Sequence, residues 1–206
     1  MRRTPRYVPA EKSADSGFTL VELIVYMSFA TVILVIIGGL FINSLKAERS
    51  IRSASEATTL GQLVAQSVQA GVRNASAVRA ESDTDGDLLI ARRATAGAIA
   101  GWSCQAWYYS NAERAVYSKT TTPAAAIELP TGGPEGSWTK LGTGIDPVAS
   151  SPVFQLTPPA DPPVVDAPDS IDISFSVDAG ERPPVLIETT AYSRTPAQES
   201  EPCFDF

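Results

Sequence analysis

The 206-residue sequence contains no histidine and only two cysteines, Cys104 and Cys203. Without histidine, nucleophilic catalysis of the Ser-His-Asp or Cys-His kind lacks its general base. Two well-separated cysteines do not have the spacing of a zinc site. No glycine-rich segment has the lysine and the following helix of a phosphate-binding loop. We therefore expect no enzymatic activity, no catalytic residues, no metal and no cofactor.

Basic residues are scarce over most of the chain. Residues 1–17 have four basic and two acidic side chains, whereas the remaining residues have 12 basic and 21 acidic ones. Nucleic-acid binding depends strongly on Lys and Arg contacts to phosphate. We therefore expect no direct nucleic-acid binding.

Lysine and arginine are absent between Phe18 and Asn43, and Glu22 is the one charged residue in that interval. The apolar run over residues 18–42 has 25 residues, more than the roughly 20 that a helix needs to cross a bilayer and more than a cleaved signal peptide provides. We expect a single span of the plasma membrane. Because the chain is basic before the run and acidic after it, the N-terminus should be cytoplasmic and the C-terminal domain outside.

Glu22 is costly in this position. A carboxylate within a membrane helix costs about 2.5–3.5 kcal/mol on insertion scales, so it requires a partner or a function. The apolar run itself offers no cation. A free amine at Phe18, created by cleavage after Gly17 in the same or a neighbouring chain, is an obvious candidate.

The segment Gly17-Phe-Thr-Leu-Val-Glu-Leu23, followed by the long apolar run, closely resembles the class III signal of type IV pilins and of the pseudopilins of secretion and competence systems. The resemblance implies that a prepilin peptidase cleaves after Gly17 and methylates Phe18. It also implies that Glu22 pairs with the N-terminal amine of a neighbouring subunit during assembly. The implied partners are the peptidase, other pilin or pseudopilin subunits, the membrane and the inner-membrane assembly machinery. An ordinary signal anchor with the same residues is the alternative.

Helical spacing continues beyond the apolar run. Apolar residues recur on one stripe at Leu60, Val64, Val68 and Val72. No proline follows the leader until Pro123, so we expect one helix from about residue 19 to about residue 72. The predicted organisation is a cleaved leader (1–17), a transmembrane and assembly helix (18–42), its amphipathic continuation (43–74) and an extracytoplasmic β-rich domain (75–206).

The later sequence predicts strands. Short apolar or aromatic runs occur at residues 88–91, 103–109, 115–118, 152–156, 171–177 and 185–192. The run at 171–177 alternates apolar and polar residues, which is typical of a half-buried strand. We expect an antiparallel sheet covered by the second part of the helix, and mostly loop over residues 123–168. This is a pilin-like α+β fold, and the order of elements resembles, more loosely, the J- or W-type minor pilins and pseudopilins.

Three further features have two interpretations each. Cys104 and Cys203 both lie in the part expected to face an oxidising compartment, which predicts a disulfide, with two free buried thiols as the alternative. The acidic segment from Asp83 to Asp87 is reminiscent of the start of a calcium loop, but an Asp-Gly turn between the helix and the first strand explains it better. The aromatic residues of one predicted strand could form an exposed binding strip or, more often, sheet core; they are Trp102, Trp107, Tyr108 and Tyr109.

These observations predict a structural subunit of a pilus or pseudopilus, a minor pilin or pseudopilin serving adhesion, secretion, motility or DNA uptake. After assembly its location would be a cell-surface pilus. The alternative is a membrane-anchored extracellular adhesin or binding domain that does not polymerise.

Overall fold

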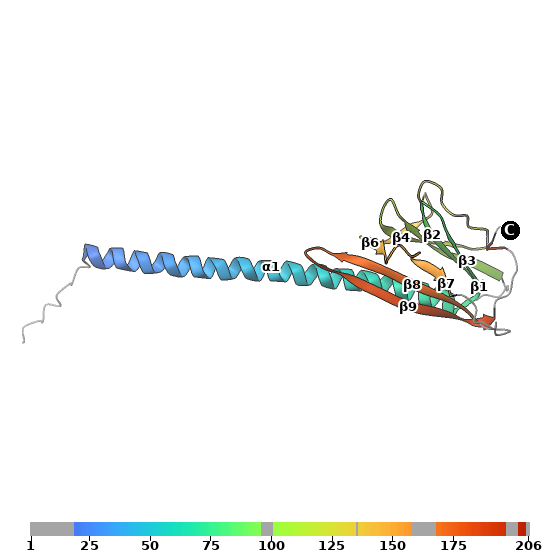
Figure 1. Ribbon diagram of the computed structural model, residues 1–206, viewed down its shortest axis with the longest axis horizontal. Coiled ribbons are helices and arrows are strands. Elements are labelled where there is room, and N and C mark those ends of the chain that lie inside the picture. Colours follow the sequence, from blue (N-terminus) through green and yellow to red (C-terminus); the bar gives the residue numbers. More distant parts are fainter. Residues whose placement is uncertain (1–18, 96–100, 135, 158–167, 197–201, 205–206) are drawn as a thin grey trace, which may run out of the picture. The chain divides into compact units, whose positions relative to one another are not determined.

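The computed structural model describes residues 19–95, 101–134, 136–157, 168–196 and 202–204 (Figure 1). The chain divides into two compact units, residues 1–47 and residues 48–206. The proposed cleavage pair, Gly17 and Phe18, lies outside the described residues.

Helix α1 spans Leu20–Arg73 without interruption, which confirms the predicted single long helix. It begins after Thr19, whose side-chain Oγ1 accepts a hydrogen bond from the backbone N–H of Glu22 (3.3 Å). Threonine is a favoured N-cap because its oxygen satisfies one of the unpaired N–H groups of the first turn. At the other end, the Asn74 side-chain amide donates to the carbonyl of Ala70 (2.8 Å), which satisfies one of the last free carbonyls.

The first unit contains the apolar part of α1. Its large apolar side chains are exposed from Leu20 to Leu45. By length and composition, α1 is the one helix of the described chain that could cross a membrane.

The second unit combines the end of α1 with two antiparallel sheets, so the fold is α+β, as predicted. The first sheet has the order β1-β2-β3-β4-β5, with bounds Ala75–Ser82, Gly86–Thr95, Gly101–Ser110, Ala115–Thr121 and Thr139–Thr143. In the second sheet, β8 (Pro168–Ala179) pairs with β6 (Ile145–Pro147), β7 (Phe154–Leu156) and β9 (Arg182–Pro196).

Two expectations about the strands are wrong. The sequence predicted one sheet, and the structure has two. The sequence also predicted no strand directly after the helix and mostly loop over residues 123–168, but β1 follows Asn74 immediately, and β5, β6 and β7 form in the proline-rich stretch. The sequence of strand β1 is Ala-Ser-Ala-Val-Arg-Ala-Glu-Ser, which has mostly small side chains and no clear alternation of apolar and polar residues. Backbone pairing with β2 stabilises it, and local patterning does not reveal such pairing.

The main core lies between α1 and the two sheets. The helix contributes Val64, Val68 and Val72, each with no exposed surface, and they pack in one cluster with apolar residues of both sheets. Figure 1 shows this part of α1 lying against strands β8 and β9. Trp107 of β3 is fully buried in this cluster, and its indole N–H donates to Ser67 Oγ of the helix (2.9 Å). The helical stripe predicted from the sequence is therefore the helix's buried face.

A second core occupies the other face of the first sheet. Leu88, Ile90 and Tyr108 are buried there beside the disulfide between Cys104 and Cys203. The structure thus joins the two cysteines, as the compartment argument predicted. The disulfide attaches the end of the chain to β3.

Candidate functional site

Glu22 lies in the first turn of α1 and is partly exposed. Its carboxylate accepts a hydrogen bond from the hydroxyl group of Tyr26, one turn along the helix (Oε1 to hydroxyl oxygen, 3.2 Å). Its position three residues after the Thr19 N-cap is the one that Glu occupies in a capping box. The structure therefore supplies one local partner for the carboxylate, the hydroxyl group of Tyr26, which the sequence did not predict.

The energies of these local interactions can be compared with the cost of placing the Glu22 carboxylate in a membrane helix. A carboxylate near a helix N-terminus gains about 0.3–1 kcal/mol from the helix dipole. A net hydrogen bond to a charged group contributes about 1.5–3 kcal/mol. Together they are of the same order as the insertion cost of about 2.5–3.5 kcal/mol. The helix dipole and the Tyr26 hydroxyl group could therefore offset much of such a cost, but neither supplies a full positive charge.

The helix surface beside Glu22 is apolar. Leu23, Tyr26, Met27 and Ala30 line a shallow groove of about 370 Å³. The sequence predicted that this surface faces lipid or other helices. In either environment, exposed leucine, isoleucine and valine side chains lose their contact with water.

The acidic segment from Asp83 to Asp87 forms a turn. Asp83 Oδ1 accepts backbone N–H bonds from Asp85 (2.8 Å) and Gly86 (2.9 Å), while Asp87 Oδ2 accepts the N–H of Val153 (2.7 Å). The turn connects β1 to β2, and not the helix to the first strand as the sequence suggested. In the described ranges, no group of three or more His, Cys, Asp or Glu residues could hold a metal ion.

Most of the aromatic run on β3 is core. Trp107, Tyr108 and Tyr109 are buried, whereas Trp102 keeps 40% of its surface exposed. Burial raises the pKa of Tyr109 to about 12, and the negative charges of Asp146 and Asp87 add to this effect. The sheet-core interpretation is therefore correct for Trp107, Tyr108 and Tyr109, whereas Trp102 is partly exposed at the surface.

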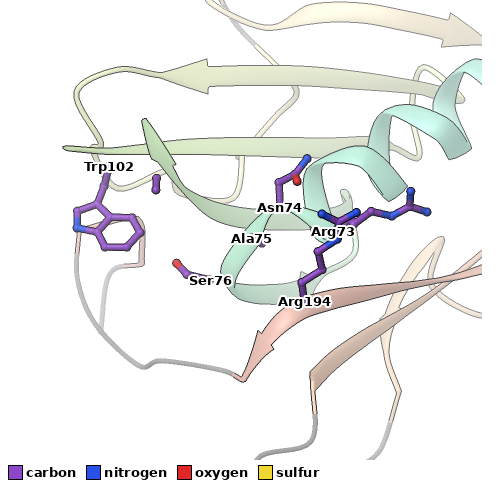
Figure 2. A pocket seen from close by; sticks show the side chains of 7 residues that line it. Arg73, Asn74, Ala75, Ser76, Trp102 and Arg194 are labelled. Atoms are coloured by element: carbon purple, nitrogen blue, oxygen red, sulfur yellow. The ribbon is translucent and has the colours of Figure 1, made fainter. Parts of the chain in front are cut away.

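Trp102 borders a pocket that sequence reasoning did not find. The pocket has a volume of about 400 Å³ and is lined by Arg73, Asn74, Ala75, Ser76, Ala94, Trp102 and Arg194. Figure 2 shows Arg194 reaching from β9 toward the end of α1, where the Arg73 side chain extends along the helix, and Trp102 on the opposite side beyond Ser76. No local motif joins residues so far apart in sequence, so no signal in the sequence could have identified the pocket.

Comparison with protein-family models, curated proteins and solved structures found no match.

Proposed function

We propose that this chain is a type IV pilin-like subunit, a minor pilin or pseudopilin. It would be cleaved after Gly17, methylated on Phe18 and held in the plasma membrane by the first part of α1, with its C-terminal domain outside. The observation that carries this proposal is the Gly-Phe-Thr-Leu-Val-Glu motif at the start of an apolar helix that continues, unbroken, into the core of an α+β domain. An ordinary signal anchor does not require that continuity.

The exposed apolar surface of α1 supports a mechanism of storage and transfer. In the membrane, lipid covers the side chains between Leu20 and Leu45. In a filament, the helices of neighbouring subunits would cover them instead, so the transfer exchanges one apolar environment for another. The charge of Glu22 would then fix how the helices of neighbouring subunits align along their length. A carboxylate among packed helices is tolerated only opposite a cation, and here the cation would be the N-terminal amine of a cleaved neighbouring subunit.

A membrane-anchored binding domain that never polymerises is the second candidate. The contact that favours it is the hydrogen bond from Tyr26 to Glu22, which satisfies the carboxylate within one chain. On this hypothesis Glu22 is a helix-capping residue and needs no partner from another subunit.

Mass spectrometry of the protein isolated from its host tests the processing step. The pilin proposal predicts a mature chain that begins with N-methylated Phe18. An intact segment from Met1 to Gly17 would refute processing and leave the anchored binding domain as the explanation.

Replacing Glu22 by glutamine separates the two roles of its side chain. Glutamine keeps the acceptor for Tyr26 and the capping geometry, but it removes the charge. The pilin proposal predicts that Glu22→Gln, like Glu22→Val, inserts into the membrane and is lost from sheared filaments, measured by immunoblot of the membrane and filament fractions. Glu48→Gln, at an exposed position further along α1, is the matched control and should assemble normally. Normal assembly of Glu22→Gln would show that the charge has no part in it.

A further inference from the structure

The groove beside Glu22 lies on the part of α1 that the proposed function places between subunits. Leu23, Tyr26, Met27 and Ala30 line it, and its volume is about 370 Å³. Ala30 has no side-chain atom beyond Cβ, so the larger residues around it border an open space. All four lining residues are exposed in the single chain. Lipid would cover this groove in the membrane, and another subunit would cover it in a filament.

Tyr26 connects the groove to the carboxylate of Glu22. It lines the groove, and its hydroxyl group donates to Glu22 Oε1 (3.2 Å). Leu23, at the start of the groove, follows Glu22 directly in the chain. The carboxylate and the groove are therefore neighbours on one side of the helix. A carboxylate has about four acceptor positions, so the bond from Tyr26 leaves others for a further donor.

The residues that line the groove favour an aromatic occupant. Lipid chains already surround any apolar side chain in the membrane, so burial alone does not select a partner there, and packing contacts do. Tyr26 offers a ring, and aromatic pairs gain energy beyond the burial of their surface. Met27 offers a thioether sulfur, which makes favourable contacts with ring edges. An aliphatic side chain in the groove would gain neither contact.

We propose that this groove receives the Phe18 side chain of a second copy of this chain. The inference rests on the proposed function, because Phe18 becomes a chain terminus only after cleavage behind Gly17. The amine that would pair with Glu22 and the phenylalanine ring belong to the same residue. A chain end that brings its amine to Glu22 therefore brings the ring as well, and the ring requires an apolar site directly beside the carboxylate. The groove is that site, since it begins next to Glu22 and contains Tyr26.

A side chain from the middle of a neighbouring helix is the alternative occupant. Helices pack by inserting the side-chain ridges of one into the grooves of another, which requires no chain end. Such packing leaves the ring of Phe18 elsewhere. The two arrangements therefore differ in the residue that touches Met27.

Photo-crosslinking from Met27 identifies the occupant. The chain has two methionines and cleavage would remove Met1, so photo-methionine supplied to the host is left at position 27 alone in the mature chain. No Lys or Arg lies between Phe18 and Lys46, so trypsin releases residues 18–46 as one peptide. A crosslink between copies joins two such peptides, and fragmentation by mass spectrometry locates the attached residue. We expect this dimer in sheared filaments, joined from Met27 to Phe18, and adducts with lipid acyl chains in the membrane fraction.

Variants of the groove supply a second readout, the crosslink yield per assembled subunit. Ala30→Leu fills the space and should lower this yield at least about fivefold, because overpacking is costly. Val32→Phe is the matched control; it adds similar bulk about 200° around the helix from Ala30 and should change the yield less than about twofold. Tyr26→Ala should lower the yield at least about threefold, whereas Tyr26→Phe, which keeps the ring, should retain at least about half of it.

Three results from a cleaved and assembled chain would overturn this inference and leave the subunit role intact. A filament crosslink from Met27 to another residue of a second copy would assign the groove to packing between helices. A crosslink to a different protein would show that the occupant is not a second copy. An unchanged yield in Ala30→Leu would show that the space is not filled on assembly. An uncleaved chain, or one absent from filaments, would instead refute the proposed function and remove the occupant with it.

Discussion

Replacing Gly71 by alanine tests the contact between α1 and the first sheet. A Cβ atom at this position would lie 2.6 Å from Cζ2 of Trp107 and still closer to Cη2. Real Cβ atoms do not approach other heavy atoms so closely, so the buried indole would have to move. That movement would also disturb the hydrogen bond from Trp107 to Ser67.

The expected change in the free energy of unfolding is a balance of opposing terms. Alanine gains about 1 kcal/mol over glycine inside a helix. Overpacking a filled core costs about 1–3 kcal/mol, and the weakened hydrogen bond about 0.5–1.5 kcal/mol more. We expect Gly71→Ala to lose about 2 kcal/mol, which lowers the Tm by about 4–8 °C for a chain of this size.

Thermal unfolding of the full chain in detergent, followed by near-ultraviolet circular dichroism, measures this effect. Gly38→Ala is the matched control on the same helix, because its Cβ would meet no atom within 4 Å. Trp107→Phe, which removes ring atoms, should make the Gly71→Ala change less costly than it is in the wild type. A Gly71→Ala variant as stable as the wild type, or more so, would refute the described packing of α1 on β3.

Two other predictions concern the stability of the outer domain. Replacing both Cys104 and Cys203 by alanine should lower the free energy of unfolding by about 2–5 kcal/mol, because the disulfide joins residues 99 positions apart in the chain. Denaturant unfolding measures this loss of stability. An unchanged unfolding midpoint would contradict the expectation. Tyr109 has a pKa of about 12 when folded, against an ordinary value of 10.0. The unfolded chain therefore releases this proton first, and the stability present below pH 10 should fall as the pH rises from about 10 to about 12. Denaturant midpoints across this range test it, and Tyr109→Phe should show a weaker decline.

The elements that sequence patterns predicted well are those specified by neighbouring residues. Helix α1 follows from an apolar run and a continuous 3.6-residue stripe ending at Val72, with its end near Asn74. Strand β8 follows from the alternation between Ile171 and Val177. The disulfide was predicted because the chain has two cysteines and both lie in the part expected to face an oxidising compartment.

The features that the sequence did not predict depend on contacts between distant residues. Strand β1 has no apolar pattern of its own and forms because its backbone groups pair with β2. The division into two sheets depends on which strands pair with β8. The aromatic residues on β3 look alike in sequence, but Trp107 lies under the helix and Trp102 lies at the end of the sheet.

By itself, the sequence determined the long helix, its capacity to span a membrane, the position of Glu22 within it and the β-rich character of the rest. Only the tertiary structure decided that Arg73, Trp102 and Arg194 share one pocket. The physical reason is that periodicity acts over a few residues along the chain. The meeting of a helix end with the ends of two strands depends instead on how sheets and helix pack around a common core.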